Sequence, residues 1–560
     1  MSRSHFPSLR FAPPPATPLP MRLLPRLLLL AGLVASPLSA LATPPKLVVA
    51  ILVDQLRYDY LEALHDHFAP GGFRFLAEKG AFLTFAHYNY APTVTGPGHA
   101  SFLSGSTPAM HGIIGNDWFD KRSRLMVNCV SDPDAAPVGS NDPAARRSPK
   151  NFIGDNFADA LRMRFGSKVV GISLKDRGAI LPAGHKPQGA FWFDSTSGRF
   201  ITSSYYTQEL PAWVSQFNAR QLPQSFTGQK WTRLKNPSVY SGPTVALGAS
   251  PLPGEKTAAF DHSVAPSPTE GFETLVPTPF GNQLLTELAL AAVDGEKLGS
   301  GTHPDLLSVS FSSLDACGHR FGPSSHEVQD MVLRLDLELE RFFQALDQRL
   351  GLHNVWIILT ADHGVAPTPE AALAHGLDGL RADMNALTAD LLAKLEQRFG
   401  AGRFLLTPKI IDGNVYLDYG ALAERRLIPE EIAAFVRDWA LDTGKFQAGY
   451  TRSQLLEGRA QGPLGERIRN GFNAERSGDI VLVQKPFHIP GGGRGGTTHG
   501  APYAYDTHVP ILFYGAPFKQ GRCAEPVAIT DIVSTLCVAL RMTEPAMNMG
   551  KPVLAVLRPD

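Results

Sequence analysis

Four short, predominantly apolar runs recur along the chain: KLVVAILV, KVVGISL, LLSVSFSS and VWIIL, at residues 46–53, 168–174, 306–313 and 355–359. Runs rich in β-branched residues are typical of strands buried on both faces of a parallel sheet. Helical patterns lie between them, the clearest at residues 326–350. The alternation predicts an α/β fold, a doubly wound, mostly parallel central sheet with helices on both faces. Residues 480–483 and 509–514 predict further strands.

Each of these four runs leads to charged or metal-binding side chains. Asp54 follows the first run, Lys175 the second and Asp315 the third, while Asp362 and His363 follow the fourth. In open α/β sheets, ligands bind at the carboxyl ends of the strands. The pattern therefore places these five side chains along one edge of the sheet, which we call the carboxyl edge.

Two stretches interrupt the alternation. Residues 186–275 are rich in Pro, Ser, Thr and aromatic residues, and residues 368–475 carry helical patterns with mixed charge. Neither stretch has the composition of a linker between independent domains. We interpret both as insertions that form a cap over the carboxyl edge, within a single catalytic domain of residues 43–560.

The N-terminal segment has the pattern of a secretory signal. Arg22 and Arg26 precede the apolar run LLLLAGLVA, and the sequence ALA at 40–42 fits a small-residue cleavage site. This predicts a signal peptide over residues 1–42, a periplasmic or secreted protein, and no membrane insertion after cleavage. An uncleaved membrane anchor is the alternative, although the run is short for a membrane span. Met21 is an alternative start.

The composition of the 560 residues excludes some partners. The formal net charge is zero and the pI is about 7.3, which argues against nucleic acid or an anionic membrane as a structural partner. Four cysteines allow three pairings, of which Cys523 with Cys537 closes the shortest loop and is favoured over pairings with Cys129 or Cys317. No C-x-x-C spacing is present, which argues against a thiolate metal site.

The stretch YNYAPTVTGPGHAS, residues 88–101, carries candidate nucleophiles. Gly96 and Gly98 allow a tight turn and close approach of a ligand, and Pro97 suits the first turn of a following helix. A hydroxyl just before such a helix faces unpaired N–H groups, which suits an anion or a developing alkoxide. On this stretch alone, an ordinary proline- and glycine-rich turn is the simpler interpretation. The rest of the chain favours the functional one.

Six candidate metal ligands combine three carboxylates with three imidazoles. Asp315 and His319 are spaced i, i+4 and share a helix face, and His499 lies in the glycine-rich stretch GGRGGTTHGAPYAYDTHVP. The others are Asp54, Asp362 and His363. Nitrogen and oxygen ligands without thiolate suit catalytic zinc, and six ligands make two sites of three, as in two-metal displacement. His508 remains ambiguous as a further ligand.

The ordered motifs from residue 46 to about residue 510 resemble the alkaline phosphatase superfamily. Within it the chain is most similar to the phosphate-irrepressible alkaline phosphatase branch, which is related to nucleotide pyrophosphatase/phosphodiesterases. The motifs that carry the resemblance are LVDQLRYDYL, NYAPTVTGPGH, GIIGNDWFD, GISLKDRGAILPAGH, SFSSLDACGHRFGP, LTADHG and GTTHGAPYAYDTHVP.

The resemblance implies a role for each candidate residue. One zinc ion would be held by Asp315, His319 and His499, and the other by Asp54, Asp362 and His363, with Thr95 as the nucleophile on that second metal. Asn116, Lys175 and Arg177 would contact phosphoryl oxygens, and Thr93 is the alternative hydroxyl. The expected protein is a zinc-dependent alkaline phosphatase that forms a phosphothreonine intermediate. No magnesium is expected, because this branch has lysine and arginine at the place of the third metal of better-known alkaline phosphatases.

Small-molecule phosphate monoesters are the expected substrates. Lys175, Arg177 and Asn116 can donate to the two charged non-bridging oxygens that a monoester presents, whereas a diester has one such charge. A phosphodiesterase or nucleotide pyrophosphatase on the same scaffold is the main alternative, since Tyr205 and Tyr206 could stack on a nucleoside. The arylsulfatase nucleophile motifs C-x-P-x-R and S-x-P-x-R are not at the required position. A catalytically inactive zinc-dependent binding protein is a further alternative. It would lack at least one of the candidate metal-ligating residues, and none of them is missing. The sequence does not determine the oligomeric state.

Overall fold

The computed structural model describes residues 44–264, 271–491 and 495–559, so the predicted signal peptide lies outside the described residues. A central sheet of eleven strands organises these residues. Its order is β19 (Gly521–Cys523), β2 (Ala81–His87), β18 (His508–Tyr514), β12 (Val355–Thr360), β1 (Leu47–Val53), β11 (Asp305–Phe311), β6 (Val169–Ser173), β7 (Gly189–Asp194), β8 (Arg199–Ser203) and β5 (Pro137–Val138), with β20 (Val527–Ala528) also paired to β2.

The middle of the sheet is parallel. Strands β12, β1, β11, β6 and β7 are neighbours that run in one direction, and Leu47 pairs with both Asp305 and Val355. Every residue of β1, β11 and β12 is buried, as expected for strands covered on both faces. Strand β18 runs antiparallel to both β12 and β2, and β8 runs antiparallel to β7. The predicted fold class, a mostly parallel α/β sheet, is confirmed.

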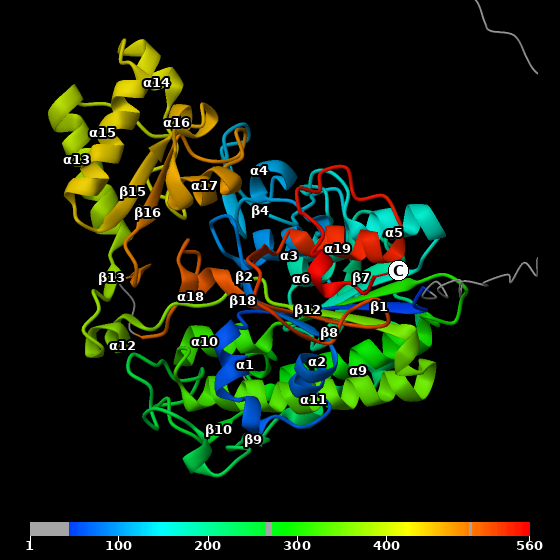
Figure 1. Cartoon of the computed structure of the whole chain (residues 1–560). Helices are drawn as coiled ribbons and strands as arrows, with labels where there is room; N and C mark the ends of the chain where they lie inside the picture. The colour runs from blue at the N-terminus through cyan, green and yellow to red at the C-terminus, as the bar shows by residue number, and fades with distance from the viewer. Residues whose placement is uncertain (1–43, 265–270, 492–494, 560) are drawn as a thin grey trace, which may run out of the picture. The chain divides into compact units, whose positions relative to one another are not determined.

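Helices cover both faces of the sheet (Figure 1). One layer contains α1 (Tyr58–Ala63), α2 (Phe73–Lys79), α9 (Pro279–Gly295), α10 (Ser313–Phe321) and α11 (His326–Leu350), and the other contains α3 (Thr95–Ser104), α5 (Phe157–Phe165), α6 (Asp176–Ala183) and α19 (Asp531–Leu540). Helix α11 has the predicted bounds. It begins where the Ser325 hydroxyl accepts a hydrogen bond from the Val328 amide, and it buries its apolar stripe against the sheet layer.

The first predicted insertion differs from a simple cap. Strands β7 and β8 lie within it, yet they pair in the central sheet, because the run GAFWFD is apolar enough to be buried there. The later part contains α7 (Ala212–Ala219), α8 (Leu222–Phe226), β9 (Lys230–Trp231) and β10 (His262–Ser263). It packs against the helical layer, where the Trp231 indole donates to Asp330 of α11 at 2.6 Å. Much of this stretch therefore extends the sheet and covers helices.

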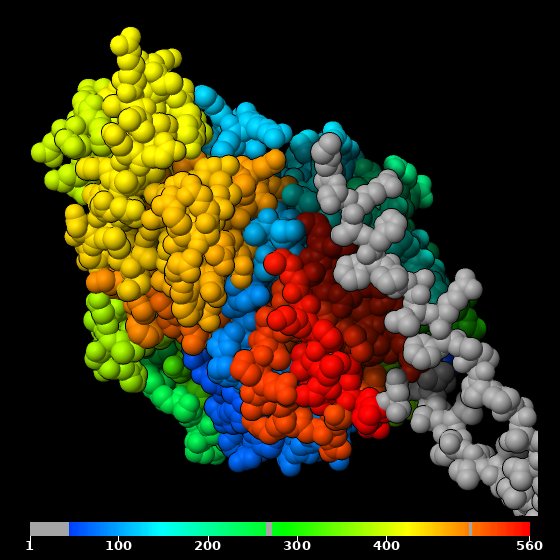
Figure 2. All heavy atoms as spheres, turned by 45° about the horizontal axis from the view of Figure 1, so that its top comes forward, coloured from blue at the N-terminus to red at the C-terminus, as the bar shows by residue number. Residues whose placement is uncertain are grey.

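The second insertion forms a substructure with a sheet of its own, which we call the cap and define as residues 369–490. Its elements are α12 (Pro369–Ala374), β13 (Leu380–Ala382), α13 (Met384–Phe399), β14 (Asn414–Val415), α14 (Tyr419–Glu424), α15 (Pro429–Asp442), β15 (Phe446–Thr451), α16 (Arg452–Leu456), α17 (Gly462–Gly471), β16 (Ile480–Gln484) and β17 (His488–Pro490). The predicted strand at 480–483 is β16, which joins the antiparallel cap sheet β14-β16-β15 and not the central one. Figure 2 shows the yellow and light-orange residues of the cap side by side in one part of the molecule.

An apolar cluster stabilises the cap independently of the central sheet. It includes the buried side chains Leu391, Ile432, Trp439 and Ile480. A second, smaller cluster joins the cap to the rest of the chain, since it packs Ile468 and Phe472 with Ala91 and other residues. The cap is therefore fixed beside the stretch that carries the candidate nucleophiles.

The cysteines form no disulfide within the described residues, which include all four. Cys129, Cys317 and Cys537 are buried thiols, and Cys523 is half-buried. The favoured pairing of Cys523 with Cys537 is therefore wrong in this structure: Cys523 lies in the edge strand β19, and Cys537 is enclosed within helix α19. No helix among the described residues combines the length and the apolar character needed to span a membrane.

Candidate active site

The carboxyl edge of the sheet gathers the residues that the apolar runs predicted. Strands β12, β1, β11 and β6 are consecutive neighbours, so Asp362, Asp54, Asp315 and Lys175 lie just past adjacent strand ends. The Asp54 amide continues the ladder by donating to the Phe311 carbonyl at 2.9 Å. Parallel pairing thus brings together side chains that are far apart in the sequence.

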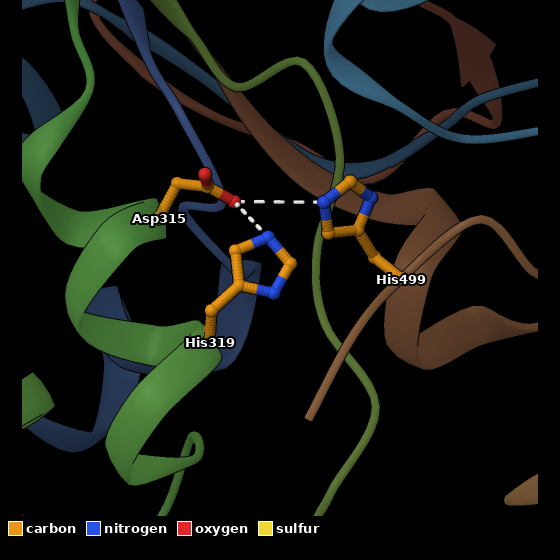
Figure 3. A group of neighbouring side chains, drawn as sticks. All are labelled: Asp315, His319 and His499. Carbon is orange, nitrogen blue, oxygen red and sulfur yellow. Dashed lines mark ion pairs between the residues drawn. The ribbon is translucent and has the colours of Figure 1, made fainter. Parts of the chain in front are cut away.

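A first group of ligand atoms consists of Asp315, His319 and His499. The two imidazoles point at one carboxylate oxygen (Figure 3): Asp315 Oδ1 lies 3.2 Å from His319 Nε2 and 3.5 Å from His499 Nε2. The other ring nitrogens face backbone carbonyls. His319 Nδ1 lies 2.9 Å from the Thr497 carbonyl oxygen, and His499 Nδ1 lies 2.8 Å from the Thr93 carbonyl oxygen. Because a carbonyl only accepts, each Nδ1 donates, and each neutral ring presents the Nε2 lone pair to the group.

A second group consists of Asp54, Asp362 and His363, all fully buried. His363 Nε2 lies 3.4 Å from both Asp54 Oδ1 and Asp362 Oδ2. His363 Nδ1 donates to the Gly364 carbonyl at 2.9 Å, so Nε2 is a lone-pair acceptor in the neutral ring. Among the described residues, none of these three facing atoms has a hydrogen-bond partner. Three buried acceptors without a donor are costly to leave unpaired, and a bound cation would satisfy them.

The two groups adjoin. Ligand atoms of Asp54, Asp315 and His363 lie within 4.8 Å of one another, which links the second group to the Asp315 carboxylate of the first. The rings of His363 and His499 stack with centroids 3.5 Å apart. The spacing is compatible with two metal ions about 4 Å apart, the separation typical of two-metal hydrolases.

The pKa values of Asp362 in the second group and Asp315 in the first group are shifted in opposite directions. Burial raises the pKa of Asp362 well above its ordinary value, and the neighbouring Asp54 carboxylate raises it further. Burial opposes ionisation of Asp315 as well, but His319 and Lys175 hold the pKa of that carboxyl well below its usual range. Burial and the neighbouring His499 together lower the pKa of His363. The second group is thus short of positive charge, which is consistent with a place for a cation.

Lys175 lies between the two groups. Its ammonium is 2.5 Å from Asp54 Oδ2 and 2.6 Å from Asp315 Oδ2. Burial would lower its pKa, but the two carboxylates outweigh burial and raise it, so the side chain is a fixed cation. Arg177 follows in the first turn of α6, and its buried Nε has no partner among the described residues. The positive charge predicted from the KDR turn therefore lies beside the ligand groups.

Thr95 is the first residue of helix α3. It follows Val94, which is extended, and it is buried. The next amide, that of Gly96, donates to Asn116 Oδ1 at 2.7 Å, which leaves the Asn116 amide hydrogens as donors. A Cβ at Gly98 would lie 2.5 Å from the Asp362 carbonyl, so glycine allows the start of α3 to approach the second group.

Thr93 and His508 contact other parts of the chain. The Thr93 hydroxyl donates to the Ala501 carbonyl at 2.8 Å and so holds the loop that carries His499. His508 hydrogen-bonds to the Thr84 carbonyl at 3.0 Å, and its ring stacks on the rings of Tyr58 and His87 with centroids 4.4 and 4.6 Å away. His508 belongs to neither ligand group.

Gln55, which the sequence analysis passed over, holds one carboxylate of each group. Its side-chain Nε2 donates to Asp315 Oδ1 at 2.7 Å, and its backbone N–H donates to Asp362 Oδ1 at 3.1 Å. The residue is buried and has a φ of 68°, an uncommon conformation outside glycine. Gly318, with no side chain, leaves room on α10 for the carboxamide. The glutamine stands next to Asp54 in the VDQ motif, but only the fold shows what it contacts.

His99 is a second residue missed by the sequence analysis. Its Nδ1 lies 2.8 Å from the Thr95 carbonyl and therefore donates, so its Nε2 accepts from the Ser310 hydroxyl at 2.7 Å. Burial lowers the pKa of His99 to about 4, which keeps the ring neutral. The ring ties the first turn of α3 to strand β11 and thereby fixes the backbone of Thr95. Its place in the motif T-x-T-x-P-x-H was visible in the sequence, but its contacts were not.

Residues 48–502 match the family described as type I phosphodiesterase / nucleotide pyrophosphatase. The chain belongs to this family. It is 37% identical to alkaline phosphatase PafA of Elizabethkingia meningoseptica, over 95% of this chain and 98% of that protein. It is 36% identical to alkaline phosphatase PhoV of Synechococcus elongatus, over 92% of this chain and 93% of that protein. Within the family, the predicted alkaline phosphatase branch is confirmed.

A solved structure gives the same result for the fold. The crystal structure of wild-type PafA matches this family member with a TM-score of 0.87 at 37% identity, covering 92% of this chain and 99% of that chain. The agreement therefore covers nearly the whole length of both chains.

Proposed function

We propose that this chain is an alkaline phosphatase that hydrolyses phosphate monoesters and releases inorganic phosphate. The observation that carries the proposal is the pair of adjoining ligand groups with the Lys175 ammonium between their carboxylates, next to the start of helix α3. The family relationship to PafA and PhoV supports the same activity.

The donor sets suit two zinc ions, in agreement with the unpaired buried atoms of the second group. Asp315, His319 and His499 would hold one ion, and Asp54, Asp362 and His363 the other, with the Thr95 hydroxyl beside the latter. Bound zinc supplies Lewis-acid charge that stabilises attacking and leaving oxygens. Lys175 and Arg177 supply the further positive charge near the phosphoryl group, so no magnesium ion is invoked.

Thr95 is the proposed nucleophile. Its Oγ forms a bond to phosphorus while the bond between phosphorus and the ester oxygen breaks, and the alcohol leaves to give a phosphothreonine. Water then forms the new bond to phosphorus, the bond to Thr95 Oγ breaks, and inorganic phosphate departs. Thr95 stands at the N-terminal end of α3, where the helix dipole favours developing negative charge, and His99 holds that turn in place.

Selectivity for monoesters is assigned to Asn116, Lys175 and Arg177. A bound monoester presents two charged non-bridging oxygens beyond those near the metal groups. The Lys175 ammonium, the unpartnered Arg177 Nε–H and the Asn116 amide are the donors that the structure offers for them. A diester would leave part of this positive charge unpaired and would have to place a second organic group there.

Export is part of the proposal. The pattern at residues 1–42 predicts a cleaved signal peptide, and we assign the mature protein to the periplasm or the external medium. N-terminal sequencing of the protein recovered from the periplasmic fraction checks this assignment. A first residue near Thr43 is expected.

The test compares 4-nitrophenyl phosphate with bis(4-nitrophenyl) phosphate, before and after exhaustive chelation and after zinc is restored. The monoester should have the higher kcat/KM, and both rates should fall with the zinc content and return with it. A higher kcat/KM for the diester would make the chain a phosphodiesterase, in line with the other activity named by its family. Full activity without metal would refute the assignment of the ligand groups.

A further inference from the structure

A partly open cavity of about 210 Å³ lies between the cap and the carboxyl edge. On the side of the ligand groups it is lined by Val94, Ile114 and His499. Val94 directly precedes Thr95, Ile114 is two residues before Asn116, and His499 belongs to the first ligand group. Three separate segments of the candidate active site therefore form one wall of the same cavity.

The opposite wall belongs to the cap. Ile410, Ile468, Phe472 and Val483 line it, and each of these side chains is mostly withdrawn from solvent. Ile468 and Phe472 also belong to the apolar cluster that joins the cap to Ala91. The cap thus supplies an apolar surface that faces the metal-ligand loop.

The lining has two acidic residues, Asp412 and Asp506, and none of the described residues that line the cavity is a lysine or an arginine. Burial raises the pKa of Asp412, and it raises that of Asp506 to about 8. Asp506 Oδ2 accepts from the amides of Gly500 and Ala501 at 2.9 and 2.7 Å, which ties it to the loop of His499. A negatively charged guest would find no cation here, whereas an uncharged apolar guest would find a matching wall.

The volume of the cavity indicates the size of the group that it can surround. A dry cavity of about 150 Å³ accepts benzene, and pockets for drug-sized molecules start at roughly 300 Å³. The cavity at the cap therefore has room for one six-membered ring with a short linker.

We propose that this cavity binds the alcohol portion of the substrate and that it selects phosphate esters of small, uncharged, apolar or aromatic alcohols. The inference rests on the proposed function, because it assigns the cavity to the organic group of the ester that the active site cleaves. His499 connects the two sites: it lines the cavity and it belongs to the first ligand group, where the leaving oxygen would be stabilised. The cap is thereby the part of the chain that determines substrate preference.

The first test uses three monoesters of alcohols with different occupants for the cavity. Methyl phosphate has no group to fill it, 2-phenylethyl phosphate offers an aromatic ring, and 2-phosphoglycolate offers a carboxylate. The first two are both esters of simple primary alcohols, so their ratio reports binding more than leaving-group chemistry. We expect kcat/KM for 2-phenylethyl phosphate to exceed that for methyl phosphate by about tenfold, and that for 2-phosphoglycolate to fall below both.

Variants assign this preference to the cavity. Ile410→Trp fills the cavity from the cap side and should lower kcat/KM for 2-phenylethyl phosphate to about the value for methyl phosphate, with methyl phosphate changed less than about twofold. Ile428→Trp is the matched control, because Ile428 is a 53% exposed residue of the same cap that does not line the cavity. Ile468→Phe repeats the test on helix α17, so that a folding defect in one variant does not decide the result.

Binding of the free alcohol separates this inference from the proposed function. The fluorine NMR signal of 2-(4-fluorophenyl)ethanol should broaden with the wild type and with Ile428→Trp, and it should stay sharp with Ile410→Trp. If wild type cleaves methyl phosphate but neither prefers the phenylethyl ester nor binds the fluorinated alcohol, the cavity assignment is refuted and the phosphatase assignment stands. Binding of the alcohol without cleavage of any monoester would support the cavity and refute the phosphatase.

Discussion

Gln55→Asn is the substitution that tests most directly how the two ligand groups are held together. Asparagine tolerates a positive φ and keeps an amide, but it is one methylene shorter and cannot reach Asp315. The backbone hydrogen bond to Asp362 is kept. The lost bond is a short one to a charged acceptor, and such bonds contribute about 1.5–3 kcal/mol. Partners that orient metal ligands are typically worth about 10–100-fold in metal affinity.

We therefore expect Gln55→Asn to weaken zinc binding by about 10–100-fold, measured by competition with a chromogenic chelator, with kcat/KM largely restored at saturating zinc. Gln329→Asn is the matched control. Gln329 is a buried glutamine of helix α11 whose amide donates to the Ser241 carbonyl at 2.9 Å, away from the ligand groups. It should lower the melting temperature and leave zinc affinity unchanged. Wild-type zinc affinity in Gln55→Asn, or an equal loss in Gln329→Asn, would refute the reasoning.

The remaining predictions concern the nucleophile, selectivity, metal content and a buried ion pair. Thr95→Ala should lower kcat by several orders of magnitude at unchanged zinc content, and Thr95→Ser should retain substantial activity; acid quenching and peptide mapping should find phosphate on the Thr95 peptide. Lys175→Ala combined with Arg177→Ala should reduce kcat/KM for monoesters far more than for diesters; equal losses would show that the pair does not sense phosphoryl charge. Elemental analysis of dialysed protein should find about two zinc ions per chain, and a single iron or manganese would contradict the ligand assignment. Burial lowers the pKa of His262, but the carboxylates of Glu327 and Glu255 outweigh burial and raise it. The ion pair therefore stabilises the folded state fully below the ordinary histidine pKa of about 6.5, and this stabilisation is lost as the pH rises through the raised pKa of the folded state. The melting temperature of the wild type should therefore fall relative to that of His262→Gln as the pH rises above about 6.5. Parallel plots of melting temperature against pH for the two proteins would contradict the prediction.

Local sequence pattern was sufficient for the central strands and for the residues at their ends. Asp54 and Asp362 each follow a run with no polar interruption, and such runs have few alternatives to a buried parallel strand. The spacing of Asp315 and His319 likewise required only helical geometry, and both lie on α10 with their side chains 3.2 Å apart. These features depend on neighbours in the sequence, which is why the sequence predicts them.

Features that depend on pairing across the fold were missed. The bond from Gln55 to Asp315 exists because β1 and β11 are adjacent and in one register, which no local pattern specifies. Strands β7 and β8 were assigned to an insertion, although their two apolar runs separated by a Ser-Thr-Ser-Gly turn are a hairpin signal. The strand at 480–483 was recognised, but its sheet was not, since the cap sheet forms from segments that lie far apart in the chain.

The fit between Gly318 and Gln55 couples the residues that these two positions can hold. A methyl group at 318 would occupy the space of the Gln55 carboxamide, so Gly318→Ala is unfavourable while the glutamine is present. The alanine would displace the carboxamide from the position in which it donates to Asp315. The two positions are distant in the sequence but share one space, so a larger residue at 318 is compatible with the ligand groups only together with a change at 55.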